Sequence, residues 1–241
     1  MLKTLRAELI KYRRNPIWLI FLILPVFPAL LGTFNYLGNI AVLDQEWFSL
    51  WSQHTIFAST FFLPAQLGVF CSWQWRLEHT DHNWNAVMSA PVSVSSIYLS
   101  KFFCDIAASL LSQFSILVLF IISGKLAGIS SPLPPDIFSW FVFGSLGSLC
   151  VCAVQLFFSL IIRSFAIPVA IALLGGIAGL LMTSQGVGLL CPYSLLCLGM
   201  RAKNPLRELP TIPFLLSCLC FITLFSFLSV RYLKKHDVTT A

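Results

Sequence analysis

Long apolar runs constrain the fold of this chain more than any other feature of its sequence. A helix that crosses a hydrocarbon layer of roughly 30 Å needs about 20 mostly apolar residues. Six stretches of the chain satisfy this requirement, and more polar stretches separate them. They lie at residues 17–38, 54–75, 101–123, 137–162, 165–184 and 212–232. The pattern therefore predicts an all-α, polytopic membrane protein with six transmembrane helices.

The composition agrees with this prediction. Of the 241 residues, 58% are hydrophobic and only 10% are charged, and the mean hydropathy is +0.87. A single soluble core could not hide so much apolar surface, so the chain is not expected to be a soluble globular protein. We expect one transmembrane domain that spans residues 1–241.

Small residues at helical spacing favour a packed bundle over isolated membrane anchors. Gly144, Ser148 and Cys152 lie four residues apart, and Gly175 and Gly179 form a G-x-x-x-G pair. Small side chains on one helical face let two backbones approach closely in a membrane. The spans that carry them are therefore expected to contact neighbouring helices along these faces.

The basic residues predict the orientation, because cytoplasmic segments carry an excess of lysine and arginine. With both termini in the cytoplasm, the inner segments hold eleven basic residues: Lys3, Arg6, Lys11, Arg13, Arg14, Arg76, Lys101, Arg163, Arg231, Lys234 and Lys235. The outer segments hold four: Lys125, Arg201, Lys203 and Arg207. This bias explains the net charge of +6 without nucleic-acid binding. The outer segment 185–211 is the exception, since three of the four outer cations lie there.

Residues 1–16 have the pattern of a helix that lies in the headgroup region. Leu2, Leu5, Leu9 and Tyr12 recur at steps of three and four, and polar residues occupy most of the remaining positions. The membrane-interface residues are Lys3, Arg6, Glu8, Lys11, Arg13 and Arg14. A short basic flank that only orients the protein is the alternative.

The polar stretch at residues 76–100 follows the second span and is predicted to be cytoplasmic. Trp73, Leu77, Trp84, Val87 and Met88 share one helical stripe, so an amphipathic helix that ends near residue 91 is expected. Its polar face carries Glu78, His79, His82, Asn83 and Ser89. This face is either solvated, or a docking surface for a cytoplasmic partner, or a metal site.

The spacing of the possible ligands argues against a metal site there. Glu78 and His79 are adjacent, so they point about 100° apart on a helix, and His79 and His82 lack the H-E-x-x-H order of zinc proteases. We therefore expect no metal and favour the docking surface.

Sequence motifs for nucleotide binding and nucleophilic catalysis are missing. No G-x-x-x-x-G-K-[ST] motif occurs, because Gly124 and Lys125 are followed by Leu126. No G-x-S-x-G motif occurs either. The chain is not expected to bind or hydrolyse ATP, and we do not expect it to be an enzyme.

The cysteines and one buried acid leave alternatives open. Most of the eight cysteines lie in apolar runs, where cysteine behaves as a small hydrophobic residue. Cys191 and Cys197 lie outside the spans and could form a disulfide. Asp105 is the single acid inside a predicted span and would be costly there if unpaired. An ion pair with Lys101 is expected, with a proton relay as the alternative.

Four stretches together resemble the permease subunits of type-2 ABC transporters, in particular the lantibiotic immunity permeases. They are "RAELIKYRRNP", "WRLEHTDHNWNAVMSAPVS" continuing to "IYLSK", "AVQLFFSLIIRSFAIP" and the terminal "KKHDV". The resemblance covers essentially the whole chain. Its most specific part is the E-H-x-x-x-N-W-N block, formed by Glu78, His79, Asn83, Trp84 and Asn85.

The resemblance implies a fold and a mechanism. Family members have six spans with both termini inside, an interface helix, and a coupling helix between spans two and three. That helix docks on a separate ABC ATPase subunit, which binds the ATP and magnesium, so the permease has no cofactor of its own. The implied coupling residues are Arg76, Glu78, His79, Asn83, Trp84 and Asn85.

The resemblance also implies a cargo and a location. The cargo would be an amphipathic antimicrobial peptide, exported from the bacterial plasma membrane for self-immunity. A second permease subunit, of the same or a related kind, would complete the transporter. The alternatives are a membrane-embedded enzyme, such as a protease or a lipid-modifying protein, and a non-transporting sensor or assembly subunit.

Overall fold

Helices form all of the regular structure in the residues that the structure describes. The structure is a computed structural model that describes residues 1–13, 15–80, 84 and 91–235. Its α-helices are α1 (Leu2–Arg13), α2 (Ile20–Ile23), α3 (Val26–Gly38), α4 (Glu46–Phe57), α5 (Leu63–His79), α7 (Val94–Leu126), α8 (Ile137–Ile161), α9 (Ala166–Ser184), α10 (Pro192–Gly199) and α11 (Thr211–Lys235). The predicted all-α class is confirmed.

Six helical stretches are long and apolar enough to cross a membrane, in agreement with the predicted polytopic fold of six transmembrane helices. They are Pro16–Gly38, Glu46–His79, Val94–Leu126, Ile137–Ile161, Ala166–Ser184 and Thr211–Lys235. The second and third stretches have 34 and 33 residues and extend well beyond the predicted 54–75 and 101–123. Helical backbone here continues past the apolar run into polar residues that make contacts at the bundle ends.

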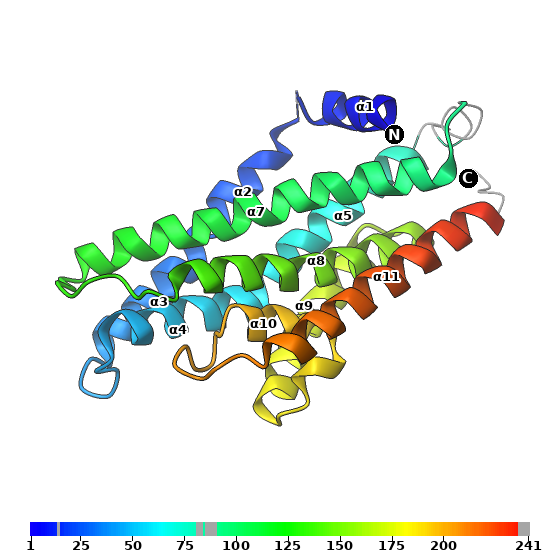
Figure 1. Cartoon of the computed structure of the whole chain (residues 1–241). Helices are drawn as coiled ribbons and strands as arrows, with labels where there is room; N and C mark the ends of the chain where they lie inside the picture. Colours follow the sequence, from blue (N-terminus) through cyan, green and yellow to red (C-terminus); the bar gives the residue numbers. More distant parts are fainter. Residues whose placement is uncertain (14, 81–83, 85–90, 236–241) are drawn as a thin grey trace.

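The second and fourth spans form the centre of the bundle (Figure 1). In their most apolar windows, 67% of the Glu46–His79 stretch and 61% of α8 are buried, against 11% of α11. The apolar side chains of α11 therefore face outwards, as expected for a helix in contact with lipid or with another subunit. The N-terminus and the end of α11 lie at the same end of the bundle (Figure 1).

A π-helical turn at Ala58–Phe62 joins α4 to α5 within the second span. Pro64 follows it and has no N–H to donate to the carbonyl group of Thr60, four residues earlier. Helix α9 approaches the backbone closely here, since a Cβ atom on Gly176 would lie 2.2 Å from the Thr60 oxygen. Only glycine fits at position 176, and its contact fixes α9 against the second span.

The short helix α10 lies in the segment 185–211 between the fifth and sixth spans, where no helix was predicted. Its Tyr193 fills the space beside the G-x-x-x-G pair of α9: a Cβ atom would lie 2.6 Å from the Tyr193 ring at Gly175 and 2.8 Å from the Tyr193 backbone at Gly179. The predicted packing role of these glycines is confirmed. Residues Cys191 and Cys197 are both free thiols, so the structure contains no disulfide between them.

Candidate functional site

Four charged side chains from three helices meet at the end of the bundle where α5 ends and α7 begins. We call this group the charged joint: Glu8 and Lys11 of α1, Glu78 of α5, and Lys101 of α7. Lys101 is fully buried, with 0% of its surface exposed. Its ammonium group donates to Glu8 at 3.2 and 3.3 Å and to Glu78 Oε1 at 2.8 Å.

Lys101 has no unused hydrogen-bonding capacity. Besides the two carboxylates, its Nζ donates to the backbone carbonyl oxygen of Gln74 at 3.1 Å. The same nitrogen lies 5.0 Å from the centroid of the Trp75 ring, within the range of a cation–π contact. An ammonium group has three protons to donate, and here all of them find acceptors.

Lys11 completes the joint from the surface side. Its Nζ donates to Glu8 Oε1 at 2.9 Å and also to Glu78 Oε1. Burial alone would lower the pKa of Lys11, but the two carboxylates outweigh it, and the pKa of Lys11 is raised above its ordinary value of 10.5. Two lysines thus neutralise two glutamates, and the joint carries no net charge.

Charge balance is what makes such burial tolerable. Removing one partner from a buried ion pair typically costs about 3–5 kcal/mol, because the remaining charge is left in a low-dielectric interior. The joint therefore holds α1, α5 and α7 in one arrangement, because separation of any of the three helices would leave a buried charge without its partner.

The predicted Lys101–Asp105 ion pair is wrong. Side chains on an α-helix lean towards its N-terminus, so Lys101 points towards the start of α7, where Glu8 and Glu78 lie. Asp105 lies one turn deeper, where it accepts a hydrogen bond from Gln74 Nε2 at 2.6 Å. Gln74 thus connects Lys101 with Asp105. Its backbone carbonyl oxygen accepts from Lys101, and its side-chain amide donates to Asp105.

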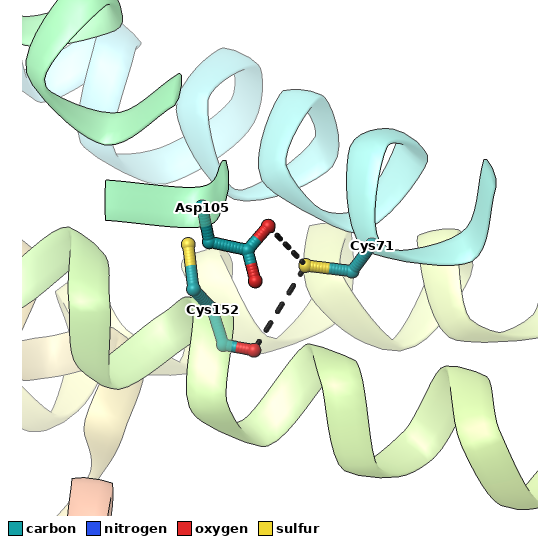
Figure 2. A group of neighbouring side chains, drawn as sticks. All are labelled: Cys71, Asp105 and Cys152. Atoms are coloured by element: carbon teal, nitrogen blue, oxygen red, sulfur yellow. Dashed lines mark hydrogen bonds between the residues drawn. The ribbon is translucent and has the colours of Figure 1, made fainter. Parts of the chain in front are cut away.

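Asp105 meets two cysteines in the interior of the bundle (Figure 2). The ligand atoms of Asp105, Cys71 and Cys152 lie within 4.8 Å of one another, and two thiols with a carboxylate form a donor set that suits zinc. The Cys71 Sγ lies 3.7 Å from Asp105 Oδ1 and 3.9 Å from the Cys152 carbonyl oxygen. Weak hydrogen bonds from a protonated thiol account for this arrangement without an ion.

The coupling residues predicted at 76–85 differ in their surroundings. Trp84 is buried, its indole N–H donates to His79 Nδ1 at 2.9 Å, and its ring stacks on Trp75 at 5.7 Å. Arg76 is exposed, with its guanidinium 5.8 Å from the Phe165 ring centroid, next to α9. The predicted residues Asn83 and Asn85 lie outside the described residues.

Glu78 was expected on an exposed polar face, but only 2% of its surface is exposed. Its carboxylate faces Lys101 and Lys11 instead, because α1 covers this side of α5. The periodicity of residues 76–85 could not predict that Glu78 is buried, because the helix that buries it, α1, is far away in the sequence.

The N-terminal helix α1, Leu2–Arg13, lies within the predicted 1–16, and its buried face makes more specific contacts than expected. Glu8 and Tyr12 are the buried residues of α1, and the Tyr12 ring packs against Trp18, Phe70 and Trp73 at 5.1–5.7 Å between centroids. Lys3, Arg6 and Arg13 are exposed, whereas Arg14 lies outside the described residues. Leu2 and Leu9 are exposed as well, which leaves an apolar strip of α1 free to face a membrane.

The members of the joint were visible in the sequence as isolated charges. Lys101 is a lone cation at the start of an apolar run, Glu78 lies shortly after the predicted end of the second span, and Glu8 is the one acid in residues 1–16. Buried charges are paired, but pairing partners on other helices can be assigned only when the fold is known.

These features define the class of protein: a polytopic membrane protein of six apolar helices, with an N-terminal helix ionically attached to the ends of two spans. Residues 4–179 match the family described as ABC-2 family transporter protein. The match covers more than half of the chain, and the chain belongs to this family. It is a membrane permease component of an ABC transporter, a class that works with an ABC ATPase. Among curated proteins, no match to the chain is found.

Proposed function

We propose that the chain is the permease subunit of an ABC exporter that moves amphipathic antimicrobial peptides out of the membrane and so provides self-immunity. ATP hydrolysis takes place in a separate ATPase subunit, which binds the ATP and magnesium. The transporter acts in a bacterial plasma membrane, with both termini in the cytoplasm and a second permease subunit beside the first. Family membership supports the transporter role, and the resemblance of the 75–93 stretch to lantibiotic immunity permeases supports the cargo.

The charged joint is the observation that carries the coupling part of this proposal. It joins the end of α5 to the start of α7, the two points from which the 80–93 segment emerges. A force applied to that segment by a partner would therefore reach α1, α5 and α7 together. Rigid elements linked by well-packed contacts transmit motion as a unit.

The six coupling residues then have two roles. Glu78 and Trp84 are buried and position the segment from inside, through Lys101 and His79. Arg76, Asn83 and Asn85 are the proposed contacts with the ATPase, since amide and guanidinium groups form directional hydrogen bonds with a soluble partner.

The experiment is co-expression of the chain with its partner ATPase, followed by purification and measurement of peptide-stimulated ATP hydrolysis. The chain alone is expected to hydrolyse no ATP, and the complex is expected to respond to a cationic amphipathic peptide. Replacement of Asn83 and Asn85 by alanine should reduce ATPase recovery while permease amounts stay normal. A Lys125→Gln variant, altered at a distant cation, serves as the control. Full ATPase recovery with the double alanine variant would refute the assigned interface.

The cargo is tested separately from the coupling. Cells that carry the complex should survive peptide concentrations that kill cells carrying a catalytically inactive ATPase. Equal survival, together with normal ATPase recovery, would leave the permease role intact and refute the peptide cargo.

The orientation is tested by accessibility of single cysteines. In a background without the native cysteines, Asp44→Cys should react with an impermeant thiol reagent added outside intact cells, and Lys235→Cys should not. Reaction at both positions, or at Lys235→Cys alone, would refute the proposed topology.

A further inference from the structure

A cavity lies where α9 ends and α11 begins, at the opposite end of the bundle from the charged joint. Its volume is about 600 Å³, within the range of small-molecule sites. Its polar lining consists of Thr183, Arg201, Lys203, Asn204, Arg207 and Glu208, and the remainder includes apolar leucines. Three cations against one carboxylate make the cavity electropositive. We call it the basic pocket.

The cations of the basic pocket form no ion pair within the part of the chain that the structure describes. The ion pairs among the described residues are all in the charged joint, and none includes Arg201, Lys203 or Arg207. Arg201 Nε is buried and has no hydrogen-bond partner in the described part of the chain. A buried donor without a partner costs about 1–3 kcal/mol, so this nitrogen would gain from an acceptor that the described residues do not supply.

The backbone at Arg201 is in a conformation that favours glycine. Its φ is +50°, a region that non-glycine residues occupy at a cost of roughly 1 kcal/mol or more. The turn is held in place, because Trp51 Nε1 donates to the Met200 carbonyl oxygen at 2.8 Å and Ala202 N donates to Cys197 O at 3.0 Å. An arginine at this position indicates that its guanidinium group serves a purpose that glycine could not.

We propose that the basic pocket binds the headgroup phosphate of an anionic phospholipid from the leaflet at that end of the bundle. Guanidinium and ammonium groups are the preferred partners of phosphate oxygens, and the positive N-terminal end of α11 begins beside the pocket. The leucines of the lining would contact the glycerol and the first methylenes of the lipid. The occupant differs from the proposed cargo, since a cationic peptide would be repelled.

This assignment also explains the exception to the charge bias. Three of the four basic residues on the predicted outer side lie in the basic pocket. The inference does not depend on the peptide cargo or on the partner ATPase, so it can be tested on the purified permease.

The test uses the Arg201→Gly variant, which distinguishes the effect of the guanidinium group on lipid binding from the effect of the backbone conformation on stability. Glycine removes the guanidinium group but suits a φ of +50°, so the lipid-free protein should be as thermally stable as the parent or more stable. Binding of phosphatidylglycerol, measured by native mass spectrometry in detergent, should weaken roughly tenfold to a hundredfold, the equivalent of one charged hydrogen-bonding group. Unchanged phosphatidylglycerol binding would refute the proposal.

A matched control and a second variant complete the test. Among the described residues, Glu46 also has a positive φ, +42°, and it lies outside the pocket, so Glu46→Gly should bind lipid normally. If Arg201→Gly fails to fold, the exposed pair Lys203→Gln with Arg207→Gln must still weaken phosphatidylglycerol binding for the proposal to stand.

Two further measurements distinguish the source of the phosphate. Phosphatidylcholine, which has no net charge, should bind more weakly than phosphatidylglycerol, and equal binding would refute selectivity for anionic lipid. Inorganic phosphate at the same concentration should not displace the lipid. Complete displacement by inorganic phosphate would show that the pocket binds free phosphate and would overturn the lipid assignment.

Discussion

The charged joint and the basic pocket lie at opposite ends of the same bundle and treat charge in opposite ways. In the joint, two lysines and two glutamates are in direct contact, and Lys101 is completely buried. In the pocket, three cations surround a cavity and form no ion pair with Glu208. The charges of the joint hold helices together and are neutralised by one another. The cations of the basic pocket, which we propose bind a ligand, form no ion pair and lie close to solvent.

The largest effect is expected from Lys101→Met. Glu8 and Glu78 would remain buried with Lys11 as their single partner, at a cost of about 3–5 kcal/mol in the free energy of unfolding. Thermal unfolding in detergent should show a marked drop, and less protein should reach the membrane. Lys125→Met is the control, since its ammonium group only lies over the Trp47 ring. Equal stability of the two variants would show that the joint does not hold the fold.

A smaller effect is expected from Glu8→Gln. The amide oxygen can still accept from Lys101, but the two lysines would then share the single negative charge of Glu78. Hydrogen bonds to charged groups contribute about 1.5–3 kcal/mol, and roughly that loss is expected in unfolding experiments. The variant should also weaken attachment of α1, detected as faster proteolysis near residues 13–16. A stability equal to that of the parent would mean that Glu8 contributes no net attraction.

Alkaline pH should release the joint in a predictable direction. The pKa of Lys11 is raised above 10.5 in the folded chain, so its stabilising contribution is fully present below that pH and is lost as the pH rises through the raised value. The attraction between Lys11 and the two carboxylates ends when the lysine loses its proton. Thermal stability measured from about pH 9 to about pH 12 should fall less steeply for Lys11→Met than for the parent.

Tyr12 requires a separate control in that titration. Burial raises the pKa of its hydroxyl group in the folded chain. The folded chain therefore holds this proton more tightly than the unfolded chain does, and the free energy of unfolding falls as the pH rises. Tyr12→Phe should therefore remove its own part of the alkaline loss and leave the Lys11 part. Identical pH profiles for parent and Lys11→Met would contradict the role assigned to this lysine.

The smallest effect on stability is expected in the basic pocket. Lys203→Gln and Arg207→Gln change exposed side chains that make no ion pair, so each should alter the free energy of unfolding by no more than about 0.5 kcal/mol. Measured beside Lys101→Met, these variants sharpen the contrast between the two ends. A loss comparable to that of Lys101→Met would mean that the pocket cations are structural.

Much of the fold follows from local properties of the sequence. Hydropathy located all six spans, because the need to pair backbone groups in lipid leaves few alternatives to a helix. The G-x-x-x-G pair at Gly175 and Gly179 predicted a close contact, and the ring of Tyr193 fills it. The partner helix α10 was not predicted, since its eight residues are too few for periodicity or hydropathy to distinguish from a loop.

The candidate site depended on contacts that sequence patterns do not contain. Glu78 and Lys101 were each recognised as notable, but Glu78 was expected to face the cytosol and Lys101 to pair with Asp105. Both expectations assumed neighbours within one segment. The partners lie on other helices instead. Glu78 and Lys101 pair with each other across 23 residues, and α1 supplies Lys11 to Glu78 and Glu8 to Lys101 across 67 and 93 residues. Pairing over such distances is a property of the fold.

The order of the charged joint along the chain has a consequence for biosynthesis. Glu8, Lys11 and Glu78 all precede Lys101 in the sequence, so a growing chain presents both carboxylates before it presents the lysine that needs them. When the third span enters the membrane, Glu8 and Glu78 have therefore already been synthesised and lie at its cytoplasmic end in the proposed topology. Insertion from the first residue onwards therefore never requires Lys101 to cross into lipid unpaired.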